Sequence, residues 1–388
     1  MTIQRLVFAK KFILPSRAAN ALQSLTMAYA FAANGVRTTL LPGFRARDRR
    51  AFQTELERGY ALRPTPDLDL TALGGGHKGI YGLHFRVGLA RRCLTADAHT
   101  VLYSRDIKEA LFLARLKRRL RLRIPFFFEM HEILSEQHRL LDTGRADRYE
   151  TMERELLREL DGIVVISPVL RDDLQRVYAP DLPVFVSPMG YNDAIFSPMP
   201  DVDLSGEVRC AYAGSLYPGK GIHNLVQAMA HLPDRFRLLV LGGNPGHELE
   251  RLREMARNVP NGAERVRFAG HRSPLELAAD LRNCHIFVVP QSSGAEFFSP
   301  IKLYEAMGLA IPTVATPVPA ITGVLRHGET ALLARDESPE ALARTIRELA
   351  TNPALAHALQ KRCRTSHQAR SWTQRAGDCL AFMNESIG

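Results

Sequence analysis

Short apolar runs alternate with segments of helical periodicity from the first residues of the chain. Residues 4–8 form an apolar run, and apolar side chains then recur at helical spacing between residues 22 and 32. Asn34-Gly35 is expected to stop this helix, and residues 36–41 form a second apolar run. A strand, a helix and a strand in this order are typical of a parallel sheet covered by helices.

The alternation continues through the first half of the chain after one irregular stretch. Residues 43–80 mix charges, prolines and the triplet Gly74–Gly76 without a clear period, which predicts loop and short helix. The triplet lacks the spacing of a dinucleotide-binding loop and does not separate a strand from a helix. Beyond it the pattern predicts strands at 101–103, 125–130 and 162–166, and helices at 107–120 and 148–160.

The second half repeats the pattern after a proline-, glycine- and aspartate-rich stretch. Residues 187–206 keep no apolar period, so a domain boundary is expected there. The predicted strands that follow are 208–213, 238–241, 266–268, 286–289, 312–315 and 331–333. We therefore expect an α/β protein of two Rossmann-like domains with parallel sheets, residues 1–190 and 207–365, joined by a linker at 191–206. Ligands of such sheets bind beyond the carboxyl ends of the strands, and the cleft between the domains is the expected site.

Composition narrows the class of protein only slightly. The 388 residues suit two domains, and the formal net charge of +10 favours anionic partners without choosing among them. The five cysteines are scattered and form no CxxC pair, so neither a zinc site nor a disulfide framework is expected. No signal peptide and no apolar run of about 18 residues is seen, which predicts a cytoplasmic protein.

A glycine-rich segment follows the first strand of the second half. Gly214 and Ser215 lead to Lys220 and Gly221, directly before a predicted helix. Glycines allow close backbone approach, a helix start offers free N–H groups, and Lys220 adds a positive charge. The combination suits a diphosphate, although a plain strand–helix turn with an exposed lysine has the same pattern.

A second segment begins a helix with Ser299-Pro300, a strong start signal. Lys302 and Glu305 follow, three residues apart on neighbouring rows of one helix face. A carboxylate there could accept hydrogen bonds from a ribose diol. The alternative is a surface ion pair worth a few tenths of a kcal/mol.

His131 lies just past a very apolar predicted strand, where α/β sheets present ligands. It could hydrogen-bond a sugar or assist proton movement, or it could be a satisfied core histidine. Glu129 and Glu132 flank it, but no third residue has metal-ligand spacing, so no metal is expected.

Residues Arg115 to Arg123 include six arginines or lysines on a predicted amphipathic helix end. Such a helix can dock on an anionic membrane, at the inner membrane face for a cytoplasmic protein, or simply form a solvated face.

Taken together, these segments resemble family 4 of the retaining glycosyltransferases, which have the GT-B fold. The resemblance covers nearly the whole chain. It rests on the stretch from Pro15 to Gln23, on Val164–Pro168, on Ser187–Phe196 and above all on Gly294–Ala315. Ser371-Trp372 resembles the point where such proteins send a final helix, here residues 366–388, back to the first domain.

The resemblance implies transfer of a sugar from a nucleotide-diphosphate sugar, most often of UDP or GDP, to a hydroxyl of a saccharide or glycolipid, without a metal or other cofactor. Lys220 would contact the diphosphate, Glu305 would hold the ribose hydroxyls, and His131 would lie near the donor sugar. Three residues at the acceptor-side loop would be Ser16, Arg17 and Asn20. Residues implied at the donor, besides Lys220 and Glu305, are Gly214, Ser215, Glu296, Phe298, Ser299, Pro300, Ile301 and Lys302.

Two positions depart from the family pattern. Ser215 stands where members often carry an arginine, and Phe297 stands where they often carry a first glutamate, with Glu296 one residue earlier. A subgroup with a Ser-Pro-x-Lys signature also lacks this glutamate, which suggests that Lys302 partly replaces the arginine.

Three other functions remain open from the sequence. A nucleotide-sugar epimerase of the same fold would need acid–base residues near the sugar's C2, and no convincing constellation is seen. A non-catalytic nucleotide-sugar-binding protein would fit Ser215 and Phe297. A nucleic-acid binder would fit the charge, but no recognised reading motif is present, so no nucleic-acid partner is expected.

Overall fold

The computed structural model describes residues 2–388 except residues 17, 45–48, 64, 75–77, 294–300 and 366–369. The chain forms two compact units. Unit 1 holds residues 1–188 and 372–388, and unit 2 holds residues 189–371. The stretch expected as a linker, 191–206, thus falls in unit 2, and the last helix falls in unit 1.

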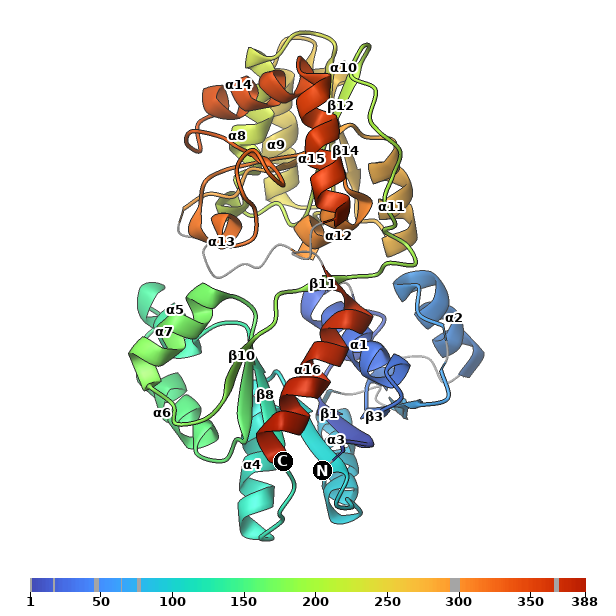
Figure 1. Cartoon of the computed structure of the whole chain (residues 1–388), viewed down its shortest axis with the longest axis vertical. Helices are drawn as coiled ribbons and strands as arrows, with labels where there is room; N and C mark the ends of the chain where they lie inside the picture. Colours follow the sequence, from blue (N-terminus) through green and yellow to red (C-terminus); the bar gives the residue numbers. More distant parts are fainter. Residues whose placement is uncertain are drawn as a thin grey trace. The chain divides into compact units, whose positions relative to one another are not determined.

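Unit 1 is built on a parallel seven-stranded sheet in the order β10-β9-β8-β7-β1-β3-β5 (Figure 1). Its strands are β1 (Arg5–Ala9), β3 (Arg37–Leu40), β5 (Leu68–Leu70), β7 (Thr100–Ser104), β8 (Phe126–Met130), β9 (Gly162–Val165) and β10 (Val184–Val186). A small sheet joins β2 (Ile13–Leu14), β4 (Gly43–Phe44) and β6 (Leu73–Gly74). The strand order reverses between β1 and β7, which is where such a sheet opens a crevice for a ligand.

The described helices of unit 1 are α1 (Ala19–Ala33), α2 (Arg49–Tyr60), α3 (Lys78–Leu94), α4 (Ile107–Arg119), α5 (Leu134–Leu140), α6 (Ala146–Leu157), α7 (Pro168–Tyr178) and α16 (Trp372–Ile387). The last helix packs along α1 and contacts β9. Its Phe382 ring stacks on Phe185 of β10, with ring centroids 5.2 Å apart. The two segments of the chain that form unit 1, residues 1–188 and 372–388, therefore share one hydrophobic core.

Unit 2 contains a parallel six-stranded sheet in the order β14-β13-β12-β15-β16-β17. Its strands are β12 (Val208–Ala213), β13 (Phe236–Leu241), β14 (Val266–Gly270), β15 (Ile286–Val289), β16 (Thr313–Ala315) and β17 (Leu332–Leu333). A two-stranded sheet pairs β11 (Gly190–Tyr191) with β18 (Arg370–Ser371). Here the order reverses between β12 and β15, which is where sheets of this kind bind their ligands.

The helical elements described in unit 2 are mostly short. They are the 3₁₀ turns η1 (Pro218–Lys220) and η2 (Met229–His231), and the helices α8 (Ile222–Ala228), α9 (His247–Arg257), α10 (Gly262–Arg265), α11 (Pro274–Arg282), α12 (Ile301–Leu309), α13 (Pro319–Thr322), α14 (Pro339–Ala350) and α15 (Pro353–Thr365).

Serine followed by proline starts three of the helices. The hydroxyls of Ser167, Ser273 and Ser338 each accept a backbone N–H three residues on, and proline takes the next position in each case. The serine satisfies an otherwise unpaired N–H, and proline loses no hydrogen bond at the first helical position. The same dipeptide precedes Ile301, the first residue of α12.

The stretch 43–80 holds more regular structure than the sequence predicted. Helix α2 spans 12 residues, and α3 begins at Lys78 and runs for 17. Phe52, Leu56 and Tyr60 are the buried row of α2, but the charges around them hide the spacing. Helix α3 leaves Leu83 and Val87 exposed, so its apolar residues do not mark one face.

Candidate functional site

The loops after β12 and β13 of unit 2 touch each other through glycine backbone. The Gly214 N–H donates to the Leu241 carbonyl, 2.9 Å away, and Gly242 has φ of +110°. A Cβ placed on Gly242 would lie 2.2 Å from the Gly214 carbonyl oxygen. Only glycine fits this approach. Gly242 was not among the predicted site residues, although its place directly after an apolar run was a signal for it.

The turn that carries Lys220 packs on the loop after β15. Gly221 has φ of +65°, and a Cβ on it would lie 1.6 Å from the Pro290 carbonyl oxygen. The Ser292 N–H also donates to the Gly219 carbonyl, 3.2 Å away. Because β12 and β15 flank the reversal of strand order, Lys220 lies beside the position in the sheet at which α/β proteins of this kind bind ligands. Burial lowers the pKa of Lys220 to about 8.

Gly214 and Ser215, the first two residues after β12, continue this loop. Both are half-buried, and the Tyr212 hydroxyl donates to the Ser215 carbonyl. The tyrosine therefore fixes the backbone of the loop at Ser215.

Glu305 is a buried carboxylate rather than half of a surface ion pair. Its residue is 5% exposed, and the Lys302 Nζ lies 2.8 Å from its Oε2. Among the described residues, no group makes a well-aligned hydrogen bond to Oε2. Burial raises the pKa of Glu305, and Lys302 opposes that shift. Helix α12 thus holds one carboxylate oxygen away from water with capacity to accept a further hydrogen bond.

Lys302 itself faces Glu305 in the structure. Ile301 begins α12 and is half-buried. The predicted donor residues Glu296, Phe298, Ser299 and Pro300 lie outside the described residues, as does Arg17 on the acceptor side.

In unit 1, His131 follows β8 directly and bonds back to that strand. Its Nε2 lies 2.7 Å from Glu129 Oε1, and its side chain is 15% exposed. Burial and the nearby Arg105 guanidinium lower the pKa of His131 to about 4. At neutral pH the ring is therefore uncharged.

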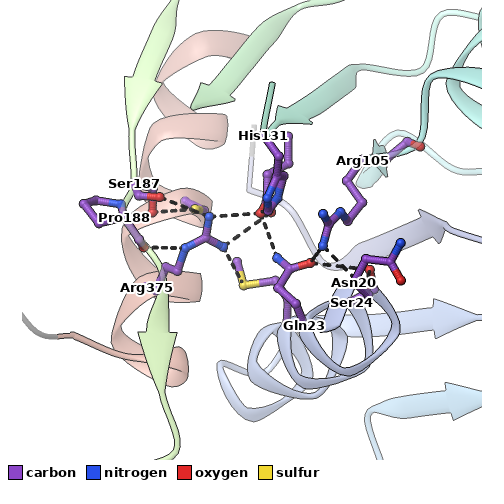
Figure 2. Close-up of polar contacts among 12 residues, drawn as sticks. Asn20, Gln23, Ser24, Arg105, His131, Ser187, Pro188 and Arg375 are labelled. Atoms are coloured by element: carbon purple, nitrogen blue, oxygen red, sulfur yellow. Dashed lines mark hydrogen bonds and ion pairs between the residues drawn. The ribbon is translucent and has the colours of Figure 1, made fainter. Parts of the chain in front are cut away.

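Glu129 is the centre of a buried polar cluster, and Figure 2 labels its partners Gln23, His131 and Arg375. It accepts hydrogen bonds from Gln23 Nε2, 2.8 Å away, from the Tyr103 hydroxyl, and from Arg375 of α16, 3.1 Å away. The Glu129 and Arg375 side chains are 0% and 1% exposed. Arg375 also donates to the carbonyls of Ser187 and Pro188. Neither Gln23 nor Arg375 was a sequence-predicted site residue, because their contacts join positions far apart in the chain.

Arg105 extends the cluster towards the start of α1. Its Nη1 contacts the Gln23 Oε1 and lies 3.5 Å from the Asn20 carbonyl oxygen. The predicted residues His131 and Asn20 therefore belong to one polar network, as Figure 2 shows. Ser16 has a different anchor, because its N–H and carbonyl both bond to the Tyr60 hydroxyl, at 2.6 and 2.8 Å.

The basic end of α4 is half neutralised by neighbouring acids. Arg115 and Arg118 both pair with Glu155, with N–O distances of 2.6 and 3.3 Å, and Lys117 pairs with Asp161 at 3.2 Å. The other three basic residues are exposed: Arg119, Arg121 and Arg123. Leu113 is buried in the core and Leu120 is 43% exposed. Residues 119–123, which end α4 and directly follow it, are called the tip of α4 and present both charge and apolar surface.

Two further features are absent from the part of the chain that the structure describes. Within the described ranges, no three or more potential side-chain ligands gather as they would around a metal ion. No described helix has both the length and the apolar character that a bilayer crossing demands.

Comparison with known proteins identifies the family. The model for glycosyl transferases group 1 matches residues 207–352, and the model for the glycosyl transferase 4-like domain matches residues 21–190. The D-inositol 3-phosphate glycosyltransferase of Corynebacterium glutamicum (strain R) is 28% identical over 289 residues, 68% of each chain. That of Corynebacterium efficiens is 30% identical over 251 residues, 58% of each chain. Glycogen synthase of Mycobacterium tuberculosis is 25% identical over 249 residues, 63% of this chain and 58% of the relative.

Solved structures agree on the fold. HepE from Anabaena, crystallised with UDP, superposes with a TM-score of 0.74 at 16% identity, covering 98% of this chain and 100% of that one. Sucrose-phosphate synthase from Thermosynechococcus elongatus gives a TM-score of 0.72 at 19% identity, with 99% coverage of both chains. The fold is GT-B, and the chain belongs to the group 1 glycosyltransferases.

Proposed function

We propose that this glycosyltransferase moves a sugar from a nucleotide-diphosphate sugar to a hydroxyl of a saccharide or glycolipid, with retention of anomeric configuration. The observation that carries the donor assignment is the pairing of two features in unit 2. Lys220 lies beside the reversal of strand order between β12 and β15, and Glu305 is a buried carboxylate whose Oε2 receives no well-aligned hydrogen bond from a described residue. The HepE structure with UDP is consistent with such a donor.

Each residue has a chemical task in this proposal. Glu305 accepts hydrogen bonds from the ribose hydroxyls at Oε2, to which no described residue gives a well-aligned hydrogen bond. Lys220 stabilises the diphosphate, on which negative charge grows as the bond to the sugar breaks. A preorganised charge in a site shielded from water can lower the barrier by several kcal/mol. Gly214 and Gly242 allow the phosphates to approach the backbone closely. Ser215 supplies no positive charge at the position where family members often carry an arginine.

The reaction breaks the bond between the anomeric carbon and the diphosphate oxygen. The acceptor oxygen forms its bond to the same carbon on the same face, and its proton passes to the leaving phosphate. Among the described site residues none is placed as a carboxylate nucleophile, which favours this direct route. Lys220 and Glu305 require no metal or other cofactor for these tasks.

Turnover is the test of the proposal. The purified chain is incubated with UDP-glucose, UDP-N-acetylglucosamine or GDP-mannose and a panel of saccharides and lipid-linked saccharides. Nucleoside diphosphate release and the anomeric proton couplings of the product are followed by NMR. We expect transfer with retention, and a loss of at least a hundredfold in kcat/KM for Lys220→Ala and Glu305→Ala, about 2.7 kcal/mol or more. Unchanged activity in both variants would refute the site, and an inverted product would refute the route.

We propose further that the tip of α4 contacts an anionic membrane surface, where a lipid-linked acceptor would lie. Arg119, Arg121 and Arg123 remain exposed around the partly exposed Leu120. Each basic residue near an anionic surface contributes about 1 kcal/mol of attraction. The paired Arg115, Lys117 and Arg118 have acidic partners already and are excluded from this surface.

A further inference from the structure

His131 is held through only one of its two ring nitrogens. Nε2 lies 2.7 Å from Glu129 Oε1, whereas no described residue forms a hydrogen bond to Nδ1. A neutral imidazole has one N–H donor and one acceptor nitrogen, and the bond made by one nitrogen decides the role of the other. The chemistry that His131 offers a ligand therefore depends on whether Glu129 accepts or donates.

The surroundings of Glu129 require it to accept. Donors reach its two oxygens from Gln23 on α1, Tyr103 on β7 and Arg375 on α16, as well as from His131. A protonated carboxyl would turn one of these oxygens into a donor facing another donor, inside a site closed to water. Arg375 beside it holds the pKa of Glu129 well below its usual range. Glu129 is thus a carboxylate, and the His131 proton lies on Nε2.

The charges around His131 keep the ring neutral. Arg105 follows β7 and Arg375 comes from α16, and both disfavour a further positive charge; Glu129, on the strand that leads to His131, favours it. Glu132, one residue on, interacts with Arg105. Together with burial, the two arginines outweigh the carboxylate, in agreement with the pKa of about 4.

We propose that Arg375 and Glu129 are positioning residues that hold the ring proton of His131 on Nε2 and so leave Nδ1 as a hydrogen-bond acceptor. A ligand group bound at Nδ1 must then donate a hydrogen bond, as a hydroxyl does, whereas an ionised phosphate has no proton to give. This ring state does not rest on the proposed function. The C-terminal helix then serves the site of unit 1 as well as its core.

The state of His131 can be read directly by NMR of the full chain labelled with ¹⁵N-histidine, using His131→Asn to assign its signals. We expect a protonated Nε2, an unprotonated Nδ1 and no titration between pH 8 and pH 5. A protonated Nδ1, or titration near the ordinary histidine pKa of about 6.5, would overturn the proposal.

The role of Arg375 is tested by Arg375→Met and Arg375→Lys. Without Arg375, Glu129 is a buried charge with one positive partner fewer, so His131 should bind a proton more readily. We expect its pKa to rise by at least one unit in Arg375→Met, and to stay below pH 5 in Arg375→Lys. Arg364→Met, in unit 2, is the control and should leave His131 unchanged. A folded Arg375→Met protein with an unaltered His131 would contradict the assignment. Should Arg375→Met fail to fold, the proposal is decided by the ring state of His131 in the wild type and by its pKa in Arg375→Lys.

Discussion

Lys220 and Glu305 are ionisable side chains whose pKa values burial shifts in opposite directions. Burial lowers the pKa of the lysine to about 8 and raises that of the glutamate, and each shift disfavours the charged form. A diphosphate favours the charged form of Lys220, and ribose hydroxyls that donate to Glu305 favour the carboxylate. In the proposed site, the bound ligand therefore opposes both pKa shifts that burial produces.

The pKa of Lys220 predicts a pH dependence of nucleotide binding. Lys220 carries its charge below about pH 8 and loses it above. UDP affinity should therefore fall as pH rises from 7 to 9, by up to about tenfold for one pH unit above the pKa. Lys220→Arg is the matched control, because an arginine stays charged over this range. Calorimetric titrations at pH 7 and pH 9 measure the change in UDP affinity for each protein. An equal change in the wild type and in Lys220→Arg would show that Lys220 does not contact the phosphates.

Some residues of the candidate site could be predicted from the sequence, and others could not. His131, Lys220 and Glu305 could be proposed because His131 directly follows a recognisable strand, while Lys220 and Glu305 lie near the starts of recognisable helices. Arg375 and Gln23 could not, because the cluster around Glu129 is made by tertiary contacts between the chain's first and last helices. The burial of Glu305 was likewise invisible from a helix period, which shows only that Lys302 and Glu305 share a face.

At the scale of elements, strand-to-helix turns position the residues that we propose to bind the nucleotide-sugar donor. The turn from β12 to α8 is held against β15 by Gly221, whose left-handed φ and contact with Pro290 both demand glycine. Strands with continuous apolar runs were predictable because burial on both faces leaves no polar position in them. Helices α2 and α3 were not, because charges mask the buried row of one and exposed apolar residues blur the face of the other.

Gly221→Ala should destabilise unit 2 far more than a left-handed φ alone would. Gly328 has a similar φ of +72°, and a Cβ added there would have nothing within 4 Å, so Gly328→Ala carries only the conformational cost, about 1–2 kcal/mol. Gly221→Ala adds the overlap with the Pro290 carbonyl and should cost at least about 2 kcal/mol more. Denaturant unfolding of both variants makes the comparison, and equal losses would contradict the close approach.

The tip of α4 makes a separate prediction about membranes. Replacing Arg119, Arg121 and Arg123 by glutamine should reduce co-sedimentation with phosphatidylglycerol-containing vesicles at least tenfold, since about 3 kcal/mol of attraction is removed. Glutamine at Arg115, Lys117 and Arg118 is the matched control and should change vesicle binding much less, because these residues already face Glu155 and Asp161. Equal effects of the two triple variants would argue against a surface made by the tip.

At the scale of the whole molecule, the two Rossmann-like units differ in the side-chain chemistry that they offer a ligand. Unit 2 offers a lysine, a buried carboxylate and glycine loops at the reversal of its sheet, which suit a nucleotide diphosphate. Unit 1 offers a polar network around Glu129, with a neutral histidine, which suits uncharged hydroxyls. The α/β class and the parallel sheets followed from the alternation of apolar runs and helices. The return of α16 to unit 1 depended on the family resemblance, since no local pattern specifies which core a terminal helix joins.

The central claim is that unit 2 binds a nucleoside diphosphate through Lys220 and Glu305. The most direct test is a thermal-shift panel of UDP, GDP and ADP on the intact chain, repeated with Lys220→Ala and Glu305→Ala. A ligand at a hundred times its Kd adds about 2.7 kcal/mol of stability, enough for a clear rise in Tm. We expect one nucleotide to raise the Tm of the wild type and to lose most of that effect in both variants. No rise with any nucleotide in the folded protein, or an equal rise in the variants, would contradict the account.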